Sequence, residues 1–224
     1  MKKIRLVVLL GNPGKMYAEN RHNAGRLLAG SLSIPLQWRN KFKGLYAAAP
    51  LPPGGENAAA EAGASFAGSG TGHEGGTPEA AHFLMPETYM NLSGESVLAA
   101  AAYYKIPCGE ILVVHDELEL PPGQAAFKEG GGLGGHNGLR SIKTCLGSAD
   151  FWRLRIGIGR PGGRKERNAD ISGWVLSDFS AEEAAVLRRV MDVCAGALLQ
   201  ALRYGPDSLL PEWNKMKICP PSGT

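Results

Sequence analysis

Short apolar runs that end in polar or turn residues mark the predicted sheet. They are Ile4–Leu10, Ala81–Met85 and Ile111–Val114. Continuous Val, Ile and Leu runs are typical of strands buried on both faces, in a parallel or mixed sheet under helices. The first run ends in Gly11-Asn12-Pro13-Gly14, and active-site residues often lie just beyond the carboxyl ends of such strands. The pattern therefore predicts an α/β domain with its chemistry at this edge.

Helical patterns separate the predicted strands. The segment Ala24–Leu32 follows a dense polar group, and an Ala-rich helix that Ser93 or Ser96 could cap runs to about Lys105, before Pro107. Later, Leu139, Ile142 and Leu146 share one helical face that ends at Gly147. Ser180 and Glu183 have the spacing of a capping box for a long helix that ends near Tyr204.

Two further strands carry basic residues. In Gln124–Glu129 we expect Phe127 to point inward and Lys128 outward, and in Phe151–Gly159 alternation places Arg153 and Arg155 on the polar face. Guanidinium groups match phosphate oxygens, so Arg155 and Lys128 could clamp a phosphate. From spacing alone, solvated charges on a half-exposed strand explain the pattern better.

The glycine-rich stretch Glu129–Asn137 disfavours both helix and strand. It could be a structural connector or a loop that presents His136 and Asn137. It also matches a dinucleotide fingerprint formally, with Gly130, Gly132, Gly135 and, about twenty residues on, Asp150. The segment before it is short and polar, which argues against that interpretation. A phosphate loop at Gly14-Lys15 is excluded by Met16 and by the glycine spacing.

Composition narrows the class of protein. The chain of 224 residues is 44% hydrophobic and 20% charged, and its net charge of +3 permits a nucleic-acid partner without requiring one. The widely spaced Cys108, Cys145, Cys194 and Cys219 predict reduced thiols in a cytoplasmic protein, and no apolar run approaches transmembrane length. We expect one domain over residues 1–210, a flexible insertion at about 50–78, and a tail over 211–224.

Three polar residues are candidates for chemistry. His22 could act as a general base, although a histidine near a helix start more often caps or faces solvent. Asp116 follows a buried strand, where a carboxylate could orient an imidazole or form an Asx turn. Asn91 could hold a peptide-like group or merely shape its loop.

In combination, these segments resemble the bacterial peptidyl-tRNA hydrolase family. Five motifs in the right order carry the resemblance across about residues 4–205: Leu9–Gly25 with Arg-His-Asn-Ala-Gly, Pro86–Gly94 with Tyr-Met-Asn-Leu-Ser-Gly, Val114–Gly123 with His-Asp-Glu-Leu-Glu-Leu-Pro-Pro-Gly, Gly130–Leu139, and Phe151–Gly159. The resemblance implies a single α/β domain with a twisted mixed, mostly parallel sheet between helices. It also implies hydrolysis of the ester between a peptide and tRNA, without metal or organic cofactor.

The resemblance also assigns roles. It implies that His22 is the base that activates water, that Asp116 supports it, and that Asn12 and Asn91 hold the peptidyl carbonyl and amide or stabilise the oxyanion. It further implies that Asn137 positions water or the tRNA 3′ end, that Lys128 and Arg155 grip the tRNA 5′-phosphate, and that Tyr17 and Met90 line the site. The implied partner is peptidyl-tRNA, bound by a monomer.

Departures from the family pattern leave intact His22, Asp116, Asn12, Asn91 and Asn137. Ala126 stands where many relatives have a second basic residue, Leu133 replaces a loop histidine, and Tyr89 replaces a common Phe. The insertion at 50–78 is longer than usual. Two rival hypotheses are a non-catalytic RNA-binding relative on the same fold and a dinucleotide-dependent enzyme.

Overall fold

One mixed sheet organises the molecule. The computed structural model describes residues 3–50, 80–162, 170–213 and 216–218. Within these residues the strands lie in the order β2-β3-β4-β1-β5-β7-β6-β8. Their bounds are β1 Leu6–Leu9, β2 Arg39–Lys41, β3 Gly44–Pro50, β4 Ala80–Pro86, β5 Ile111–Glu117, β6 Gln124–Glu129, β7 Trp152–Gly157 and β8 Met216–Lys217.

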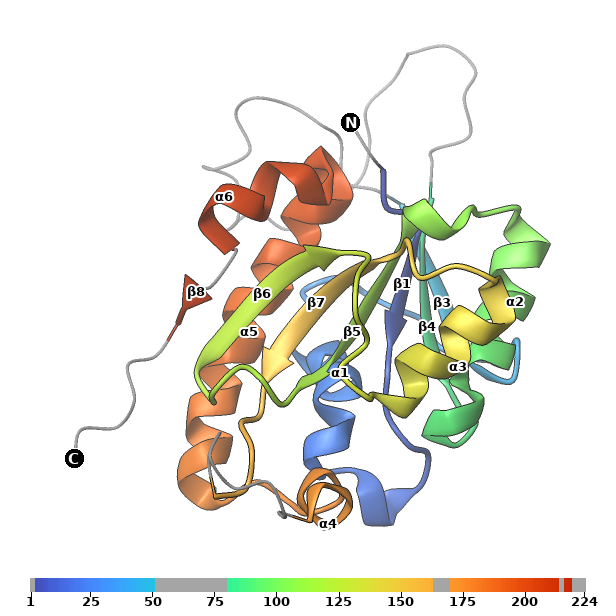
Figure 1. Cartoon of the computed structure of the whole chain (residues 1–224). Helices are drawn as coiled ribbons and strands as arrows, with labels where there is room; N and C mark the ends of the chain where they lie inside the picture. Colours follow the sequence, from blue (N-terminus) through green and yellow to red (C-terminus); the bar gives the residue numbers. More distant parts are fainter. Residues whose placement is uncertain (1–2, 51–79, 163–169, 214–215, 219–224) are drawn as a thin grey trace.

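The four central strands, β4, β1, β5 and β7, run parallel. The outer pairs are antiparallel: β3 lies against β4, β2 against β3, β6 against β7, and β8 against β6. The carboxyl ends of the parallel strands therefore meet at one edge, toward which the β1 arrow points in Figure 1. Ligands bind at this edge in open α/β sheets.

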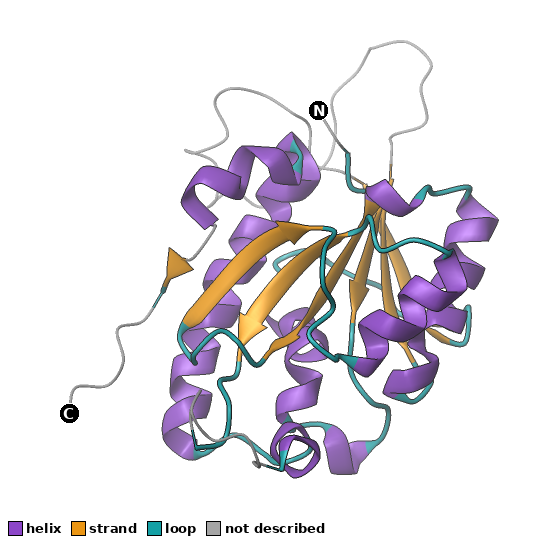
Figure 2. Ribbon diagram, in the orientation of Figure 1, coloured by secondary structure: helices purple, strands orange, loops and turns teal. Residues whose placement is uncertain are grey.

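Helices cover both faces of the sheet, as Figure 2 shows. The helices are α1 Ala24–Leu27, α2 Ser93–Tyr104, α3 Asn137–Leu146, α4 Ile171–Val175, α5 Ala181–Tyr204 and α6 Leu210–Trp213, with short 3-10 turns η1 Lys15–Tyr17, η2 Arg21–Asn23, η3 Leu28–Ser31, η4 Met90–Leu92, η5 Cys108–Glu110 and η6 Pro206–Leu209. Alternate residues of β1 enter two cores: Val7 and Leu9 pack on the α5 side, whereas Leu6 and Val8 pack on the side of α2 and α3.

Helix α1 approaches the sheet closely at Gly25. A β-carbon there would lie 2.3 Å from the carbonyl oxygen of Val114 and 2.8 Å from that of Leu10. No side chain fits into these gaps without displacing the backbone. The glycine therefore brings the segment just before it, which contains His22, onto the ends of β1 and β5.

The predicted α/β class and mixed sheet are confirmed, with the parallel strands at the centre of the sheet. The capping box of α5 is also confirmed, since Ser180 and Glu183 bond reciprocally. The expected cap of α2 is wrong, because Ser93 is the first helical residue and Leu92 occupies the cap position. No helix in the described ranges is long and apolar enough to cross a membrane.

The end of the chain differs from the predicted tail. Residues 210–213 form α6, where Trp213 is buried and its ring meets that of Phe127 edge-on at 5.5 Å between centroids. Met216 pairs with Ala125 through β8. Most of the predicted insertion, from 51 onward, lies outside the described residues, as does Cys219.

Candidate active site

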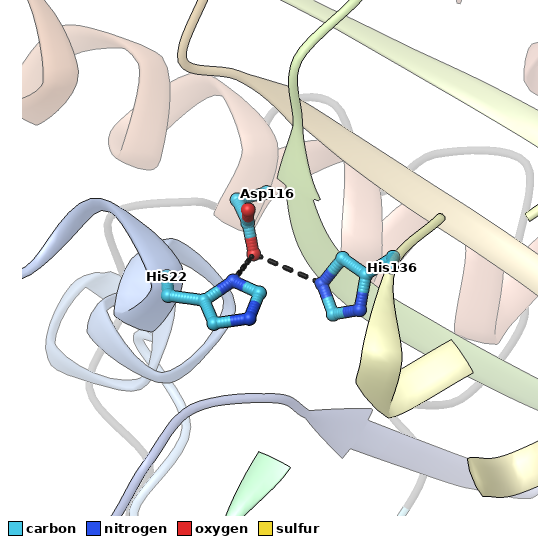
Figure 3. A group of neighbouring side chains, drawn as sticks. All are labelled: His22, Asp116 and His136. Atoms are coloured by element: carbon cyan, nitrogen blue, oxygen red, sulfur yellow. Dashed lines mark hydrogen bonds and ion pairs between the residues drawn. The ribbon is translucent and has the colours of Figure 1, made fainter. Parts of the chain in front are cut away.

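A buried carboxylate joins two imidazoles at the carboxyl end of β5. Oδ1 of Asp116 lies 2.9 Å from Nδ1 of His22 and 3.0 Å from Nε2 of His136 (Figure 3). His22 comes from η2, after β1, whereas His136 begins α3 after the glycine-rich loop. The two imidazole rings are tilted, with centroids 4.8 Å apart. Elements distant in sequence thus converge on one oxygen.

The hydrogen bonds at Nδ1 of His136 determine which ring nitrogen carries the proton in the neutral imidazole. Its Nδ1 accepts hydrogen bonds from the backbone N–H groups of Gly138, at 3.1 Å, and Leu139, at 3.4 Å, so that it caps α3. An acceptor nitrogen carries no proton, so in the neutral ring the proton lies on Nε2 and is donated to Asp116. His136 is therefore a fully bonded donor and has no lone pair available to act as a base.

His22 is arranged differently. Its Nδ1–H donates to Asp116, which leaves Nε2 without a proton in the neutral ring. Burial opposes protonation of this imidazole, but the charge of Asp116 and its hydrogen bond outweigh burial and raise the pKa of His22 above its ordinary value. The pair can therefore accept a proton at Nε2 and stabilise the resulting cation.

Asp116 is fixed as a carboxylate. Its burial alone would raise its pKa, but the interactions with His136 and His22 dominate and hold the pKa of Asp116 well below its usual range. A buried charge of this kind is stable only when it is paired and hydrogen-bonded. The two imidazole N–H groups meet that requirement at a single oxygen.

The same three side chains could be considered as metal ligands, because their ligand atoms lie within 4.8 Å of one another. Two histidines and one carboxylate are a familiar donor set. A cation bound at Nε2 of His136 would, however, require the proton to move to Nδ1. There it would face the N–H groups of Gly138 and Leu139. The hydrogen-bond pattern therefore favours a carboxylate that orients two imidazoles over a metal centre.

Asn12 is held in one orientation beside the turn that carries His22. Its Oδ1 accepts the backbone N–H of Met90 at 2.8 Å. Its own backbone N–H and C=O pair with the amide of Asn23, at 2.8 and 3.0 Å. Because Oδ1 is engaged, Nδ2 is the free end of the amide, and it bonds to no other described residue. Asn12 can thus donate one hydrogen bond to a substrate.

The other predicted lining residues differ in burial. Met90 is buried, and its sulfur occupies the space where a side chain at Gly138 would lie, which ties η4 to α3. Asn91, next to it, is exposed, and Tyr17 in η1 is half-buried. Asn137 is exposed as the first residue of α3. The ring that lies against His22 is that of the neighbouring His136.

The predicted basic clamp lies on β6 and β7. Lys128 is exposed, whereas Nε of Arg155 donates to Oε2 of Glu117 at 2.9 Å. In the register of the two strands, Lys128 is opposite Arg153, and Arg155 is two residues farther on. Side chains at these positions share one face and are diagonal neighbours. Ala126, opposite Arg155, is fully buried.

Arg153 contradicts the interpretation of this strand as a solvated face. It is only 1% exposed, and its guanidinium donates to the carbonyl of Gly132 at 2.8 Å and to that of Gly130. Burial and the nearby charge of Arg155 lower the pKa of Arg153. Strand alternation assigns a residue to a face of the sheet but does not tell which loop covers that face. Here the glycine-rich loop does.

The glycine-rich loop is therefore a connector that Arg153 fixes through hydrogen bonds to its backbone. Gly130, Gly131, Gly134 and Gly135 all have positive φ, between 52° and 82°, which explains the composition. The dinucleotide hypothesis is wrong for this loop. The strands on either side of α3, β6 and β7, are antiparallel, whereas a dinucleotide unit needs parallel strands around its helix.

Sequence reasoning did not select His136 or Glu117 as site residues. The motif that contains His136 was recognised, but the role within it was given to the neighbouring Asn137. The signal for His136 is its place before the helical pattern, since a polar residue there tends to cap the helix. Glu117 follows Asp116 directly, and strand alternation sends the two carboxylates to opposite faces.

Known proteins give an independent comparison. Residues 6–220 match the family model described as peptidyl-tRNA hydrolase. The chain is 43% identical over 220 residues to the peptidyl-tRNA hydrolase of Treponema pallidum, covering 96% of each chain. It is 41% identical over 214 residues to that of Azoarcus sp., covering 94% of this chain and 81% of the relative.

Solved structures agree in fold. A peptidyl-tRNA hydrolase from Acinetobacter baumannii superimposes with a TM-score of 0.70 and 35% identity, over 93% of this chain and 92% of that one. A complex of a peptidyl-tRNA hydrolase with N-propanol has a TM-score of 0.72 at 34% identity, over 96% of both chains.

Proposed function

Because the chain belongs to the peptidyl-tRNA hydrolase family and hydrolyses the ester of peptidyl-tRNA, we propose that it does so with His22 as general base and Asp116 as its orienting partner. One observation supports these roles above all. Nδ1 of His22 is bonded to a buried carboxylate, so that Nε2 is the basic nitrogen.

In the proposed reaction, Nε2 of His22 removes a proton from water as the water attacks the ester carbonyl. Negative charge develops on the carbonyl oxygen, and Nδ2 of Asn12 is the hydrogen-bond donor held ready for it. The protonated His22 is stabilised by Asp116 and then returns its proton to the departing ribose oxygen. The products are free tRNA and a peptide with a carboxyl end. An ester is reactive enough for one base and one donor to suffice.

Selectivity for the peptide is assigned to Asn91, Asn137, Tyr17 and Met90. We propose that Asn91 contacts the peptide amide next to the ester and that Asn137 positions water or the 3′ end, with Tyr17 and Met90 as walls. A free aminoacyl group carries a charged amine in place of that amide, so a site built for the amide rejects it. The exposure of Asn91 and Asn137 at the edge of the site is compatible with substrate contact.

The binding site for the 5′-phosphate of the tRNA is assigned to Lys128 on β6 and Arg155 on β7. Lys128 is exposed there, and Glu117 holds Arg155 through Nε, which leaves the two terminal nitrogens of the guanidinium for a phosphate. Contacts of this type supply affinity rather than sequence reading. We therefore propose that the 5′-phosphate of the tRNA binds beside the glycine-rich loop.

Release of N-acetylated amino acid from N-acetyl-aminoacyl-tRNA tests the function. The wild type should turn over this substrate, and His22→Ala should lose most of the turnover. No turnover by the wild type with tRNA binding intact would instead indicate a non-catalytic RNA-binding relative. Full turnover by His22→Ala would show that the base is a different group.

The clamp has its own test. Removal of the tRNA 5′-phosphate should raise the KM of the wild type, and Arg155→Ala should abolish the difference between the two substrates. Equal KM values for both substrates with the wild type would refute the clamp.

We also propose that the enzyme acts as a monomer in the cytoplasm, where its substrate forms. The thiols of Cys108, Cys145 and Cys194 are free, which fits a reducing compartment. Sedimentation at micromolar concentration should give a single species near the chain mass of 23.7 kDa, and a species of twice that mass would refute the monomer.

A further inference from the structure

The main chain just before His22 is joined to a segment from the far end of the sequence. Asn20 and Asp178 form an isolated antiparallel bridge, and the N–H of Arg21 donates to the carbonyl of Ser177 at 3.0 Å. The side-chain amide of Asn20 donates to the carbonyl of Leu176 at 2.6 Å. The turn that contains His22 is therefore hydrogen-bonded to residues 176–178, which follow α4 (Figure 1).

The side chain of Arg21 strengthens this junction. It is only 5% exposed, and its Nη1 donates to Oγ of Ser177 at 2.7 Å and to the carbonyl of Asp178 at 2.5 Å. Nη2 lies 2.5 Å from Oε2 of Glu183, and the guanidinium stacks 3.8 Å from the ring centroid of Trp174. A planar guanidinium can donate to all of these oxygens and stack on a ring at the same time, whereas the single ammonium of a lysine cannot.

Glu183 links the junction to the core. Its Oε2 also accepts the N–H of Ser180 at 2.7 Å in the capping box of α5. Burial would raise the pKa of Glu183, but the bonds from Arg21 and Ser180 outweigh it and lower that pKa. Helix α5 in turn packs into the core through Val190 and Leu198, so it is a rigid reference for the turn.

Arg21 is unsuited to binding the tRNA directly. Its guanidinium is buried against Trp174 and is already neutralised by Glu183, so an incoming phosphate would have to displace both contacts. On the other side of His22, the amide of Asn23 is bonded to Asn12. His22 thus lies between two anchors, one at β1 and one at α5.

From this arrangement we propose that Arg21 is a positioning residue, through which residues 174–183 hold His22 in line with Asp116. The proposal rests on the function given above, because it concerns the base of that reaction. Small displacements of a catalytic base reduce the rate strongly. A loosened junction should therefore lower kcat, while the surfaces assigned to peptide and tRNA remain unchanged.

The test compares Arg21→Lys with a matched control, Arg5→Lys. Arg5 is likewise bonded to one carboxylate, Glu110 at 3.2 Å, and to two carbonyls, those of Tyr104 and Lys105, although its side chain is 29% exposed. It lies before β1, at the amino ends of the parallel strands. We expect Arg21→Lys to lower kcat at least tenfold with less than a twofold change in KM. The control should keep kcat within twofold.

Proton NMR provides a readout that a purely structural role would not affect. The Nδ1–H of His22, bonded to Asp116, should give a downfield resonance that His22→Ala removes. In Arg21→Lys we expect this resonance to shift or broaden, while the dispersed methyl signals of the core remain. Trp174→Leu, which removes the stacking surface under Arg21 together with the hydrogen bond from Nε1 of Trp174 to the carbonyl of Gly159, replaces Arg21→Lys if the latter fails to fold.

The outcomes are separable. A wild type without turnover refutes the proposed function, whatever the variants do. If the wild type is active and His22→Ala is not, yet the Arg21 or Trp174 variant keeps full kcat and an unchanged Nδ1–H resonance, only the positioning role is refuted. A loss that appears in KM alone would also refute it, because it would assign Arg21 to substrate binding.

Discussion

The Nε2–H group of His136 donates a hydrogen bond to Oδ1 of Asp116, and the same oxygen accepts a hydrogen bond from the Nδ1–H group of His22. His136 thereby has two tasks, since its other nitrogen caps α3. The imidazole of His136 therefore links the position of α3 to the position of the Asp116 carboxylate. The two tasks can be separated by substitution.

Asparagine at position 136 should retain the cap and lose the bond to Asp116. Asn is among the best capping residues, whereas its side chain cannot also extend to the carboxylate. We expect His136→Asn to unfold at nearly the wild-type temperature but to lose about 10- to 100-fold in kcat, the value of one hydrogen bond to a charged group. His136→Ala should show the same loss of rate and, in addition, about 1 kcal/mol lower stability. Wild-type kcat in His136→Asn would exclude this role.

Asp116→Asn should change the pH dependence of the reaction in a defined direction. A base must be neutral, so kcat/KM rises with pH through the pKa of His22, which in the wild type lies above 6.5 because of Asp116. Without the carboxylate only burial remains, and the pKa of His22 falls below 6.5. The acid limb should move to lower pH while the plateau drops by ~10²–10⁴-fold. A limb that moved to higher pH would contradict the assignment.

Asn12→Asp should distinguish the two ends of the amide. The carboxylate can still accept the N–H of Met90, so the loop is retained, but the donor at Nδ2 is replaced by a negative oxygen. We expect kcat to fall by about 10²–10³-fold, as for the loss of an oxyanion donor. Circular dichroism should show an unchanged fold. If activity persists, the carbonyl oxygen is stabilised by another group.

His115 provides a prediction about stability. Complete burial, followed by the effect of nearby His136, lowers the pKa of His115 well below 6.5. Below pH 6.5 the unfolded chain therefore binds a proton that the folded chain refuses, so stability is lost as pH falls. The wild type should lose up to about 1.4 kcal/mol per pH unit more than His115→Leu. Urea titrations at pH 7.5, 6.5 and 5.5 check this, and parallel curves would contradict it.

The strands and the pairing of His22 with Asp116 could be predicted, because apolar runs and short motifs are visible in the sequence. Apolar runs indicated β1 and β5, and the polar residues after them indicated the active edge. The motif around His22 then gave a specific role to a residue that spacing alone left ambiguous. Contacts between segments distant in the sequence were harder to predict.

Three misses share one physical cause. Arg153 was expected on an open face, yet the glycine-rich loop, whose bonded carbonyls lie 21 and 23 residues earlier, covers it. His136 was passed over for Asn137, because the turn of the loop decides which of two adjacent side chains points inward. Trp213 lies in a Pro- and Lys-containing segment that gives no strong periodicity, although its ring meets Phe127. Each depends on tertiary packing that no short window of sequence contains.

The glycine-rich loop is held through its backbone, since Arg153 donates to the carbonyls of Gly130 and Gly132. A carbonyl is present whatever side chain its residue bears. Leu133 lies between these anchors and His136, and its half-buried side chain packs against the core cluster on the side of α2 and α3. For protein engineering, an apolar replacement at position 133 would therefore keep that packing, while the backbone bonds to Arg153 need no particular side chain in the loop.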